Sequence, residues 1–486
     1  MKLKIITNDF VDARHFFLLL LIRIIYPWTT IVNLTNSSYN IYGGNNNYGI
    51  DFNITKEIVA VIVFVAVTCF FLKIKDDYCI RSYFLNWAFI LYFIPLNAAF
   101  GLNNTSILFF IESNFYFLFM IIMLADRSNE SLLVDESEEE GYKQLLNQKK
   151  VIIVCCLICL AYILYKLLYN GFYFTFSLSG DVVYANRLEN NTYFNSRYSG
   201  SALGYLIELI TELSSYAAPL LLLLSLESKK HIQRILGIGV AVLCILSQYA
   251  VFSSKANILL LPVVIFIYFT EHKPELLKKL KYIFEGGIFI ALAYSLVETL
   301  RRHGESMSYI YYLILRRLMY LPAWLNYIYY DYFSKHTKIW GTQDMFILKN
   351  ILPDIHSDTI NGLINKAYFN GEIVSPNTGM FGDAYMQIGV IGIIIYPIIF
   401  KLILSWADRI YKKYGITITI LFSVNVTLQL TNVSILRGTF VLSFILITYL
   451  LGLLPRFSSS RVIYNNSEVP IRDQDSLKPS GELIRN

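Results

Sequence analysis

The residues of this chain best suited to chemistry are arginines that stand in polar segments between apolar blocks. Each guanidinium presents a planar set of N–H donors that can grip a phosphate at two points. The arginines concerned are Arg187, Arg197, Arg301, Arg302, Arg316 and Arg317. One interpretation is a clamp on a diphosphate. For Arg187 and Arg197, the other is a pair of ordinary loop cations that bind Asp181 or Glu189.

Four other positions have candidate roles. Lys255, in the short turn 253–257, can either extend to the membrane surface or bind phosphate. Asp383 follows a turn with glycine and proline, where its carboxylate can accept a proton from a hydroxyl or cap a helix. Tyr385 and Arg437 join the predicted substrate-binding residues.

Several classes of site are missing from the sequence. It contains no nucleotide-binding loop, no metal-ligand spacing and no serine-hydrolase motif. We therefore predict that the chain uses no metal and no cofactor. The net charge of +6 is small for 486 residues, so nucleic acid is not an expected partner.

The elements that must position these residues are apolar helices. The chain is 55% hydrophobic and 16% charged, whereas soluble proteins carry about 25% charged residues. Its apolar residues form blocks long enough to cross a bilayer as helices. We predict an all-α integral membrane protein with about 12 transmembrane helices. The expected spans are 16–31, 57–72, 83–101, 107–124, 151–169, 204–226, 236–252, 257–270, 284–299, 386–404, 416–431 and 439–454.

The loops between these spans predict an orientation. Alternate loops carry three or four lysines or arginines each, and the short loops between them carry at most one. Because positive residues stay in the cytoplasm, both termini are expected there. The chemistry is then expected on the outer face, where the arginine-containing segments lie.

The same topology divides the chain. A polytopic domain, 1–455, precedes a cytoplasmic tail, 456–486, whose composition indicates disorder. The domain is expected to include an acidic cytoplasmic loop, 125–150, and two long outer loops, 170–203 and 300–385. The aromatic stretch from Tyr309 to Phe333 predicts helices that lie at the membrane interface within the large outer loop.

Two carboxylates fall inside an expected span. Glu208 and Glu212 are four residues apart and so share one face of a helix. Carboxylates within the membrane usually face the protein interior. We expect a structural ion pair there, with Arg197 or Arg301 as the partner.

Three short motifs resemble those of the Wzy-type polymerases, which join oligosaccharide repeat units into O-antigen or capsule. The family's outer turn Gly/Ser-Ser-Arg-x-x-Leu-Leu is matched by Ser253–Leu259. Its pattern Thr-Gly-x-x-Gly-Glu-x-Tyr-x-x-x-Gly-x-x-Gly is matched by Thr378–Gly392. Its final span opens with Arg-Gly, here Arg437 and Gly438. Lys255 replaces the usual arginine and Asp383 the usual glutamate, and both keep the charge.

The resemblance implies a GT-C-like membrane glycosyltransferase of the bacterial inner membrane. Its substrate would be an undecaprenyl-diphosphate-linked oligosaccharide, and its partners a flippase and a chain-length regulator protein. The transfer would be inverting and independent of metal. In that reaction Asp383, Arg187, Arg197 and Arg301 would be catalytic. The predicted substrate-binding residues would be Arg302, Arg316, Arg317, Lys255, Tyr385 and Arg437.

Three alternatives remain open at this point: an O-antigen ligase, a flippase or transporter, and a non-enzymatic membrane assembly protein, which the charged outer loops argue against. An O-antigen ligase would transfer the glycan to a lipid core instead of to another repeat unit. A flippase or transporter for lipid-linked glycan would show repeated halves and broken spans. The sequence shows no internal repeat, and its two long outer loops are placed asymmetrically. These features favour an enzyme of the outer face.

Overall fold

The structure is a computed structural model of the chain. The residues that it describes are 2–35, 50–72, 80–125, 140–170, 201–228, 230–252, 261, 264–265, 268, 280–302, 307–342, 355–356, 358–369, 379–411 and 438–452.

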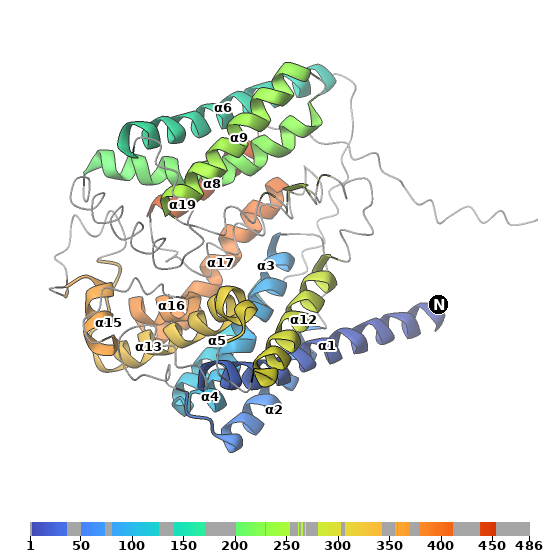
Figure 1. Cartoon of the computed structure of the whole chain (residues 1–486), viewed down its shortest axis with the longest axis vertical. Coiled ribbons are helices and arrows are strands. Elements are labelled where there is room, and N and C mark those ends of the chain that lie inside the picture. The colour runs from blue at the N-terminus through green and yellow to red at the C-terminus, as the bar shows by residue number, and fades with distance from the viewer. Residues whose placement is uncertain are drawn as a thin grey trace, which may run out of the picture.

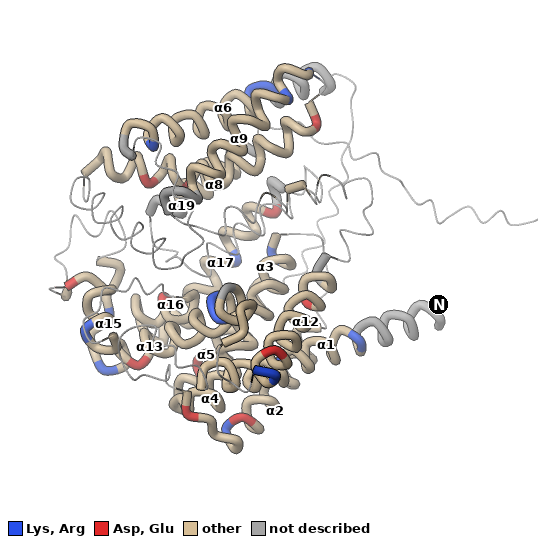
Figure 2. Tube along the Cα trace, viewed as in Figure 1, with Lys and Arg blue, Asp and Glu red and all other residues tan. Residues whose placement is uncertain are grey.

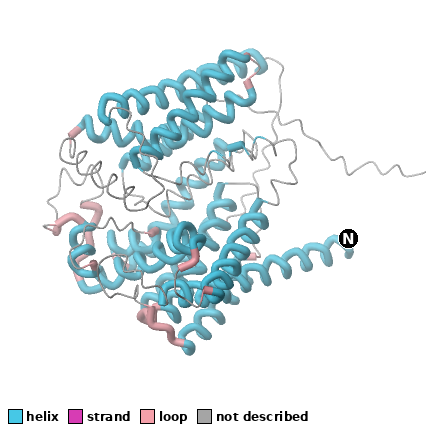
Figure 3. Tube along the Cα trace, viewed as in Figure 1, coloured by secondary structure: helices cyan, strands magenta, loops and turns pink. Residues whose placement is uncertain are grey.

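All regular structure in these residues is helical (Figure 3), which confirms the predicted all-α class. The long helices are α1 (Lys2–Thr35), α2 (Ile54–Phe71), α5 (Ile107–Leu124), α6 (Glu140–Asn170), α8 (Ala202–Glu227), α9 (His231–Phe252), α12 (Leu280–Arg301), α17 (Val390–Tyr411) and α19 (Gly438–Gly452). A composite helix joins α3 (Ile80–Ala88), the π-helical turn η1 (Phe89–Phe93) and α4 (Ile94–Leu102). The segment before α17 contains η2 (Tyr311–Tyr320), which is also π-helical, α13 (Leu321–Lys335), α15 (Ile360–Tyr368) and α16 (Met380–Ile388).

Nine helices of the described part are long and apolar enough to cross a membrane, and Figure 2 shows long stretches of helix without charge. They match nine of the expected spans. The multi-pass membrane class is therefore supported, while the total of about 12 and the GT-C-like arrangement stay predictions. The expected span 416–431 lies outside the described residues, and 257–270 lies mostly outside them. The described part of the last one, α19, has 15 residues.

One expected boundary was wrong. The span expected at 386–404 begins at Val390, because the chain breaks at Gly389 and residues 386–388 belong to α16. Helix α6 begins at Glu140, and its candidate membrane span begins at Lys149, at the end of the loop expected at 125–150. Residues 126–139 and the predicted tail lie outside the described residues.

The helices form two groups that share one core (Figure 1). In the smaller group, α6, α8 and α9 pack against one another and α19 packs on α8. The larger group contains α1 to α5, α12, α13 and α15 to α17. Helix α17 connects them: it packs on α3 and α5, and its Trp406 meets Phe444 of α19 with ring centroids 6.5 Å apart.

Polar contacts identify the two ends of the larger group. At one, which we name the Asp408 end, the Asp408 carboxylate accepts hydrogen bonds from Arg81 Nε and from the backbone amide of Ile80, each 2.6 Å long. At the other, the Tyr320 end, Asn103 donates to the Tyr320 hydroxyl at 3.0 Å. The predicted topology places Arg81 and Asp408 on the same side. Which side faces the cytoplasm stays a prediction.

An ion pair in the interior connects α1 to α2. The Arg23 side chain is fully buried, and its Nη1 lies 2.5 Å from Glu57 Oε1. Its Nε donates to Asn97 Oδ1 at 2.8 Å, and Asn97 donates in turn to Asn114 at 3.1 Å. An arginine within an apolar span is tolerated only when its charge and donors are satisfied. This network therefore holds together four elements: α1, α2, α4 and α5.

Loss of the Glu57 charge should destabilise the protein strongly. In Glu57→Gln the guanidinium of Arg23 stays buried without a counter-ion, a situation that typically costs about 3–5 kcal/mol. Loss of the exposed Lys335–Asp331 pair in Lys335→Ala should cost less than about 1 kcal/mol. Chemical unfolding in mild detergent, followed by circular dichroism, measures both. Equal losses in the two variants would contradict the structural role of the buried pair.

Candidate functional site

Four of the predicted site residues lie outside the described part of the chain. These are Arg187, Arg197, Lys255 and Arg437. Their predicted roles in diphosphate binding stay predictions. The others are placed by the structure, and they fall into two sets with different surroundings.

The first set contains the arginines near η2, and its members differ in exposure. Arg301 and Arg302 are exposed at the end of α12, where Arg302 forms an ion pair with Glu298 of the same helix at 2.6 Å. Arg317 is exposed as well. Arg316 is only 4% exposed, and its guanidinium carbon lies 4.8 Å from the centre of the Tyr312 ring. Three of the four are therefore accessible to an anion, and Arg316 is a residue of the protein interior.

The aromatic stretch behaves differently from the expectation. Tyr309 is exposed, but Tyr311, Tyr320, Tyr329 and Phe333 are at most 1% exposed. They belong to the core that the larger group forms. The prediction of an aromatic surface at the membrane interface was thus wrong for these four rings, because η2 and α13 pack against the helical bundle. Tyrosine and phenylalanine rings are stable both at a membrane interface and in a protein core, so sequence alone does not distinguish the two locations.

Glu212 has a partner on α19, and its expected pairing with an arginine stays a prediction. Ser443 of α19 donates to Glu212 Oε2 at 3.3 Å. Arg301, one of the two expected partners, is exposed at the end of another helix, and Arg197 lies outside the described residues. The Glu212 carboxylate therefore contributes to the packing of α19 on α8.

The second set lies on α16, whose start is held by side chains from distant helices. The backbone amide of Phe381 donates to the Tyr92 hydroxyl, and that of Gly382 donates to Asn326 Oδ1, both at 2.5 Å. Tyr92 itself donates to Asn326 Oδ1 at 2.8 Å, and Asn326 Nδ2 donates to the carbonyl of Pro322. The first turn of a helix leaves its amides unpaired, so buried acceptors must be supplied from elsewhere.

The glycines of the motif Thr378–Gly392 permit this packing. A Cβ on Gly379 would lie 2.0 Å from Asn326 Nδ2, and one on Gly392 would lie 2.0 Å from the carbonyl oxygen of Ala384. Gly389 has a φ of +65°, a conformation that favours glycine, and it separates α16 from α17. The motif therefore specifies a broken helix, with α16 pressed against Tyr92 and Asn326.

Asp383 lies in the first turn of α16 and is 2% exposed. It is close enough to the hydroxyls of Tyr92 and Tyr116 to interact with them electrostatically. Gly379 occupies the N-cap position, so the alternative capping role for Asp383 was wrong in detail. A carboxylate in the first turn still favours the helix dipole. Asp383 therefore lies in the interior of the larger group, beside these two tyrosines.

Tyr385, two residues after Asp383, belongs to a group that we name the Glu112 cluster: Glu112, Tyr330, Lys338 and Tyr385. The rings of Tyr330 and Tyr385 have centroids 4.3 Å apart, and Lys338 Nζ lies 4.8 Å from the centre of the Tyr385 ring. The Glu112 carboxylate lies close enough to the Tyr330 hydroxyl for each group to shift the pKa of the other. Helices α5, α13 and α16 thus contribute a carboxylate and two phenols, and Lys338, which follows the end of α13, contributes an amine.

The cluster has distinctive electrostatics. Burial lowers the pKa of the Lys338 amine, and the nearby Glu112 charge opposes that shift. Burial raises the pKa of the Tyr330 and Tyr385 hydroxyls, and Glu112 adds to both shifts. The phenols therefore stay protonated and can donate hydrogen bonds. A half-buried carboxylate beside donors and an amine is suited to orienting a hydroxyl and accepting its proton.

Sequence reasoning missed three members of this cluster. Glu112 is an acid within an expected span, 107–124, and that rarity was the available signal. Lys338 and Tyr330 stand in a segment rich in lysine and tyrosine, where nothing marks them individually. Among the described residues, no group of three or more His, Cys, Asp or Glu side chains is close enough to hold a metal ion.

Replacement of Gly379 by alanine should displace the start of α16. The new methyl group would collide with Asn326 and Tyr92, and overpacking of this kind costs about 1–3 kcal/mol. Gly287→Ala is the matched control, because its new methyl group would meet no neighbouring atom within 4 Å and alanine favours a helix. Thermal unfolding in detergent should show a lower midpoint only for Gly379→Ala. Equal midpoints would argue against the close contact.

Lys338 should be acylated at lower pH than Lys335. Only the unprotonated amine reacts; burial lowers the pKa of Lys338, whereas the hydrogen bond to Asp331 raises the pKa of Lys335. Peptide mapping after brief acetylation at a series of pH values gives the midpoint for each lysine. Because Glu112 opposes the shift, Glu112→Gln should move the Lys338 midpoint to still lower pH and leave Lys335 unchanged. A midpoint for Lys338 above that of Lys335 would refute the assignment.

No protein-family model matches this chain, and neither a curated protein nor a solved structure is detectably similar to it.

Proposed function

We propose that the chain polymerises lipid-diphosphate-linked oligosaccharide repeat units at the outer face of a bacterial inner membrane. The observation that carries the proposal is the Glu112 cluster. It joins Tyr385 of the motif Thr378–Gly392 to a carboxylate and an amine from two other elements. The predicted topology assigns the Tyr320 end, where α5 begins and α13 lies, to the outer face.

The proposed reaction needs no nucleotide, because the lipid diphosphate is already a leaving group. A hydroxyl oxygen of the acceptor attacks the anomeric carbon of the donor sugar. The bond from that carbon to the diphosphate oxygen breaks, and the lipid diphosphate leaves with the electron pair. The hydroxyl proton passes to a carboxylate. The protein must therefore supply a base, donors that orient the hydroxyl and cations that stabilise the leaving charge.

Glu112 is assigned the role of base. Asp383 was the residue expected there, but it is nearly inaccessible, whereas Glu112 is half-buried beside the half-buried Lys338. Asp383 is assigned instead to positioning, through Tyr92 and Tyr116. The Tyr330 and Tyr385 hydroxyls orient the acceptor. With these assignments, the motif carboxylate Asp383 has a structural role on α16, and the proton is transferred to Glu112 on α5.

The leaving diphosphate is assigned to cations. Lys338 stands in the cluster itself, and Arg301, Arg302 and Arg317 are exposed near η2. Arg187, Arg197, Lys255 and Arg437 stay candidates from sequence. Arg316 is assigned to packing through its contact with Tyr312. Preorganised cations in a site shielded from water are a major source of stabilisation for a developing negative charge.

Deletion in the host strain tests the activity. A strain that lacks a polymerase should carry single repeat units on its lipid acceptor or lipid carrier. A strain that lacks a flippase should instead trap repeat units inside and show no surface glycan. A strain without a ligase should accumulate polymer on the lipid carrier. Full-length polymer in the deletion strain would refute the proposal.

Complementation of that strain tests the assignment of Glu112. Glu112→Gln keeps the shape of the side chain but removes the base, so turnover should fall by roughly 10²- to 10⁴-fold. The surface glycan should then stop at one or a few units. Asp358→Asn is the control, because Asp358 is in an exposed pair with Lys366 at the surface. With expression and thermal stability matched, wild-type chain lengths in Glu112→Gln would exclude Glu112 as the base.

A further inference from the structure

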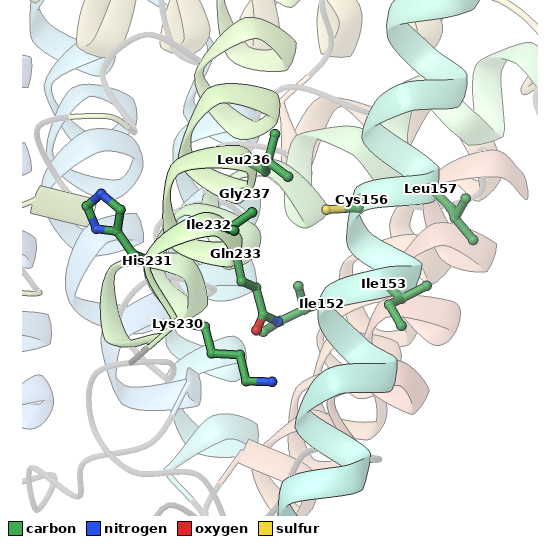
Figure 4. Close-up of a pocket in the computed structure, with 10 residues that line it drawn as sticks. All are labelled: Ile152, Ile153, Cys156, Leu157, Lys230, His231, Ile232, Gln233, Leu236 and Gly237. Carbon is green, nitrogen blue, oxygen red and sulfur yellow. The ribbon is translucent and has the colours of Figure 1, made fainter.

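A groove lies between α6 and α9, in the smaller group of helices and away from the Glu112 cluster (Figures 1 and 4). Its volume is about 750 Å³, within the range of roughly 300–1,000 Å³ usual for sites that bind small molecules. Its lining residues are Ile152, Ile153, Cys156, Leu157, Lys230, His231, Ile232, Gln233, Leu236 and Gly237.

The walls of the groove are apolar and open to the surroundings. Ile153 and Leu157 of α6 are 57% and 59% exposed, and Ile232 and Leu236 of α9 are 74% and 64% exposed. Both helices contain candidate membrane spans. Apolar side chains on such helices face lipid when they do not face protein. The occupant that meets these walls is therefore a hydrocarbon chain.

Lysines stand at one end of the groove. Lys149 and Lys150 begin the span of α6, and each is one helical turn before a lining residue, Ile152 or Ile153. Lys230 immediately precedes α9, and Figure 4 shows its side chain extended toward α6. All three lysines are exposed. Within the described part of the chain, none of them has an acidic partner.

Two further lining residues are polar, His231 and Gln233. The imidazole of His231 points away from the groove in Figure 4, so it is not part of the cationic end. Gln233 lies between Lys230 and the apolar walls, and its amide can hydrogen-bond to an ester. The order along the groove is thus a positive charge, a polar group and then hydrocarbon-like walls.

We propose that this groove binds an anionic phospholipid of the surrounding bilayer. The phosphate lies among Lys149, Lys150 and Lys230, and an acyl chain lies against Cys156 and Leu236. The order of groups in the groove matches the order of groups in such a lipid. A neutral lipid would leave the three charges unused, and a free phosphate compound would leave the apolar walls bare. Basic sites between membrane helices have the same chemistry.

Cys156 gives a test in the unmodified protein. The full chain is purified in detergent and titrated with palmitoyl-oleoyl-phosphatidylglycerol or with the matching phosphatidylcholine. Alkylation of Cys156 by a maleimide is followed by peptide mapping. Phosphatidylglycerol should slow the alkylation of Cys156 at least tenfold. Cys69 is exposed on α2, and its rate should not change. Equal protection by both lipids, or none by either, would overturn the proposal.

Variants separate the headgroup from the acyl chain. The triple variant Lys149→Ala, Lys150→Ala, Lys230→Ala should lose the preference for phosphatidylglycerol, since each lysine is expected to contribute roughly fivefold. Lys335→Ala with Lys366→Ala, two exposed lysines elsewhere, is the control and should keep it.

Leu236→Trp keeps every lysine and Cys156, and fills the groove. Native mass spectrometry should show that this variant retains less phosphatidylglycerol than the wild type, with circular dichroism confirming that it is folded. A triple variant that kept its preference would overturn the proposal for the headgroup. Unchanged retention by Leu236→Trp would overturn the proposal for the acyl chain.

Discussion

The start of α16 is buried, and its backbone amides must find acceptors inside the protein. Tyr92 and Asn326 supply them, and these two side chains also bond to each other. A buried amide without a partner would cost more than most side-chain contacts gain. The position of α16 therefore depends on η1 and α13 together. Since α16 carries Asp383 and Tyr385, the place of these two residues in the candidate site depends on the same three hydrogen bonds.

A second buried network, at Arg23, acts on a different part of the larger group. Its charge pair joins α1 to α2, and its amides extend the contact to α4 and α5. α5 also carries Glu112, so the network and the candidate site share a helix. The two networks differ in kind. One neutralises the charge of the Arg23 side chain, and the other gives hydrogen-bond acceptors to the backbone amides at the start of α16. In both networks, protein groups supply the hydrogen bonds that water would supply elsewhere, because a membrane interior contains no water.

The nine spans found in the described part of the chain were predictable, because an apolar block of the right length has few other uses. The break at Gly389 was not, although the glycines that permit it were visible in the motif. Their meaning depends on Asn326 and Tyr92, which are distant in sequence. The buried tyrosines of η2 and α13 could not be recognised either, because the same rings suit an interface or a core.

The hydrogen bond from Phe381 to Tyr92 joins residues that are 289 positions apart. During synthesis, η1 is made early and must wait for α13 and then for α16. The first helices can insert and pair while the candidate site does not yet exist. Assembly of the candidate site therefore requires that the early helices remain in place, with the contact surface of Tyr92 accessible, until most of the chain has been translated and inserted.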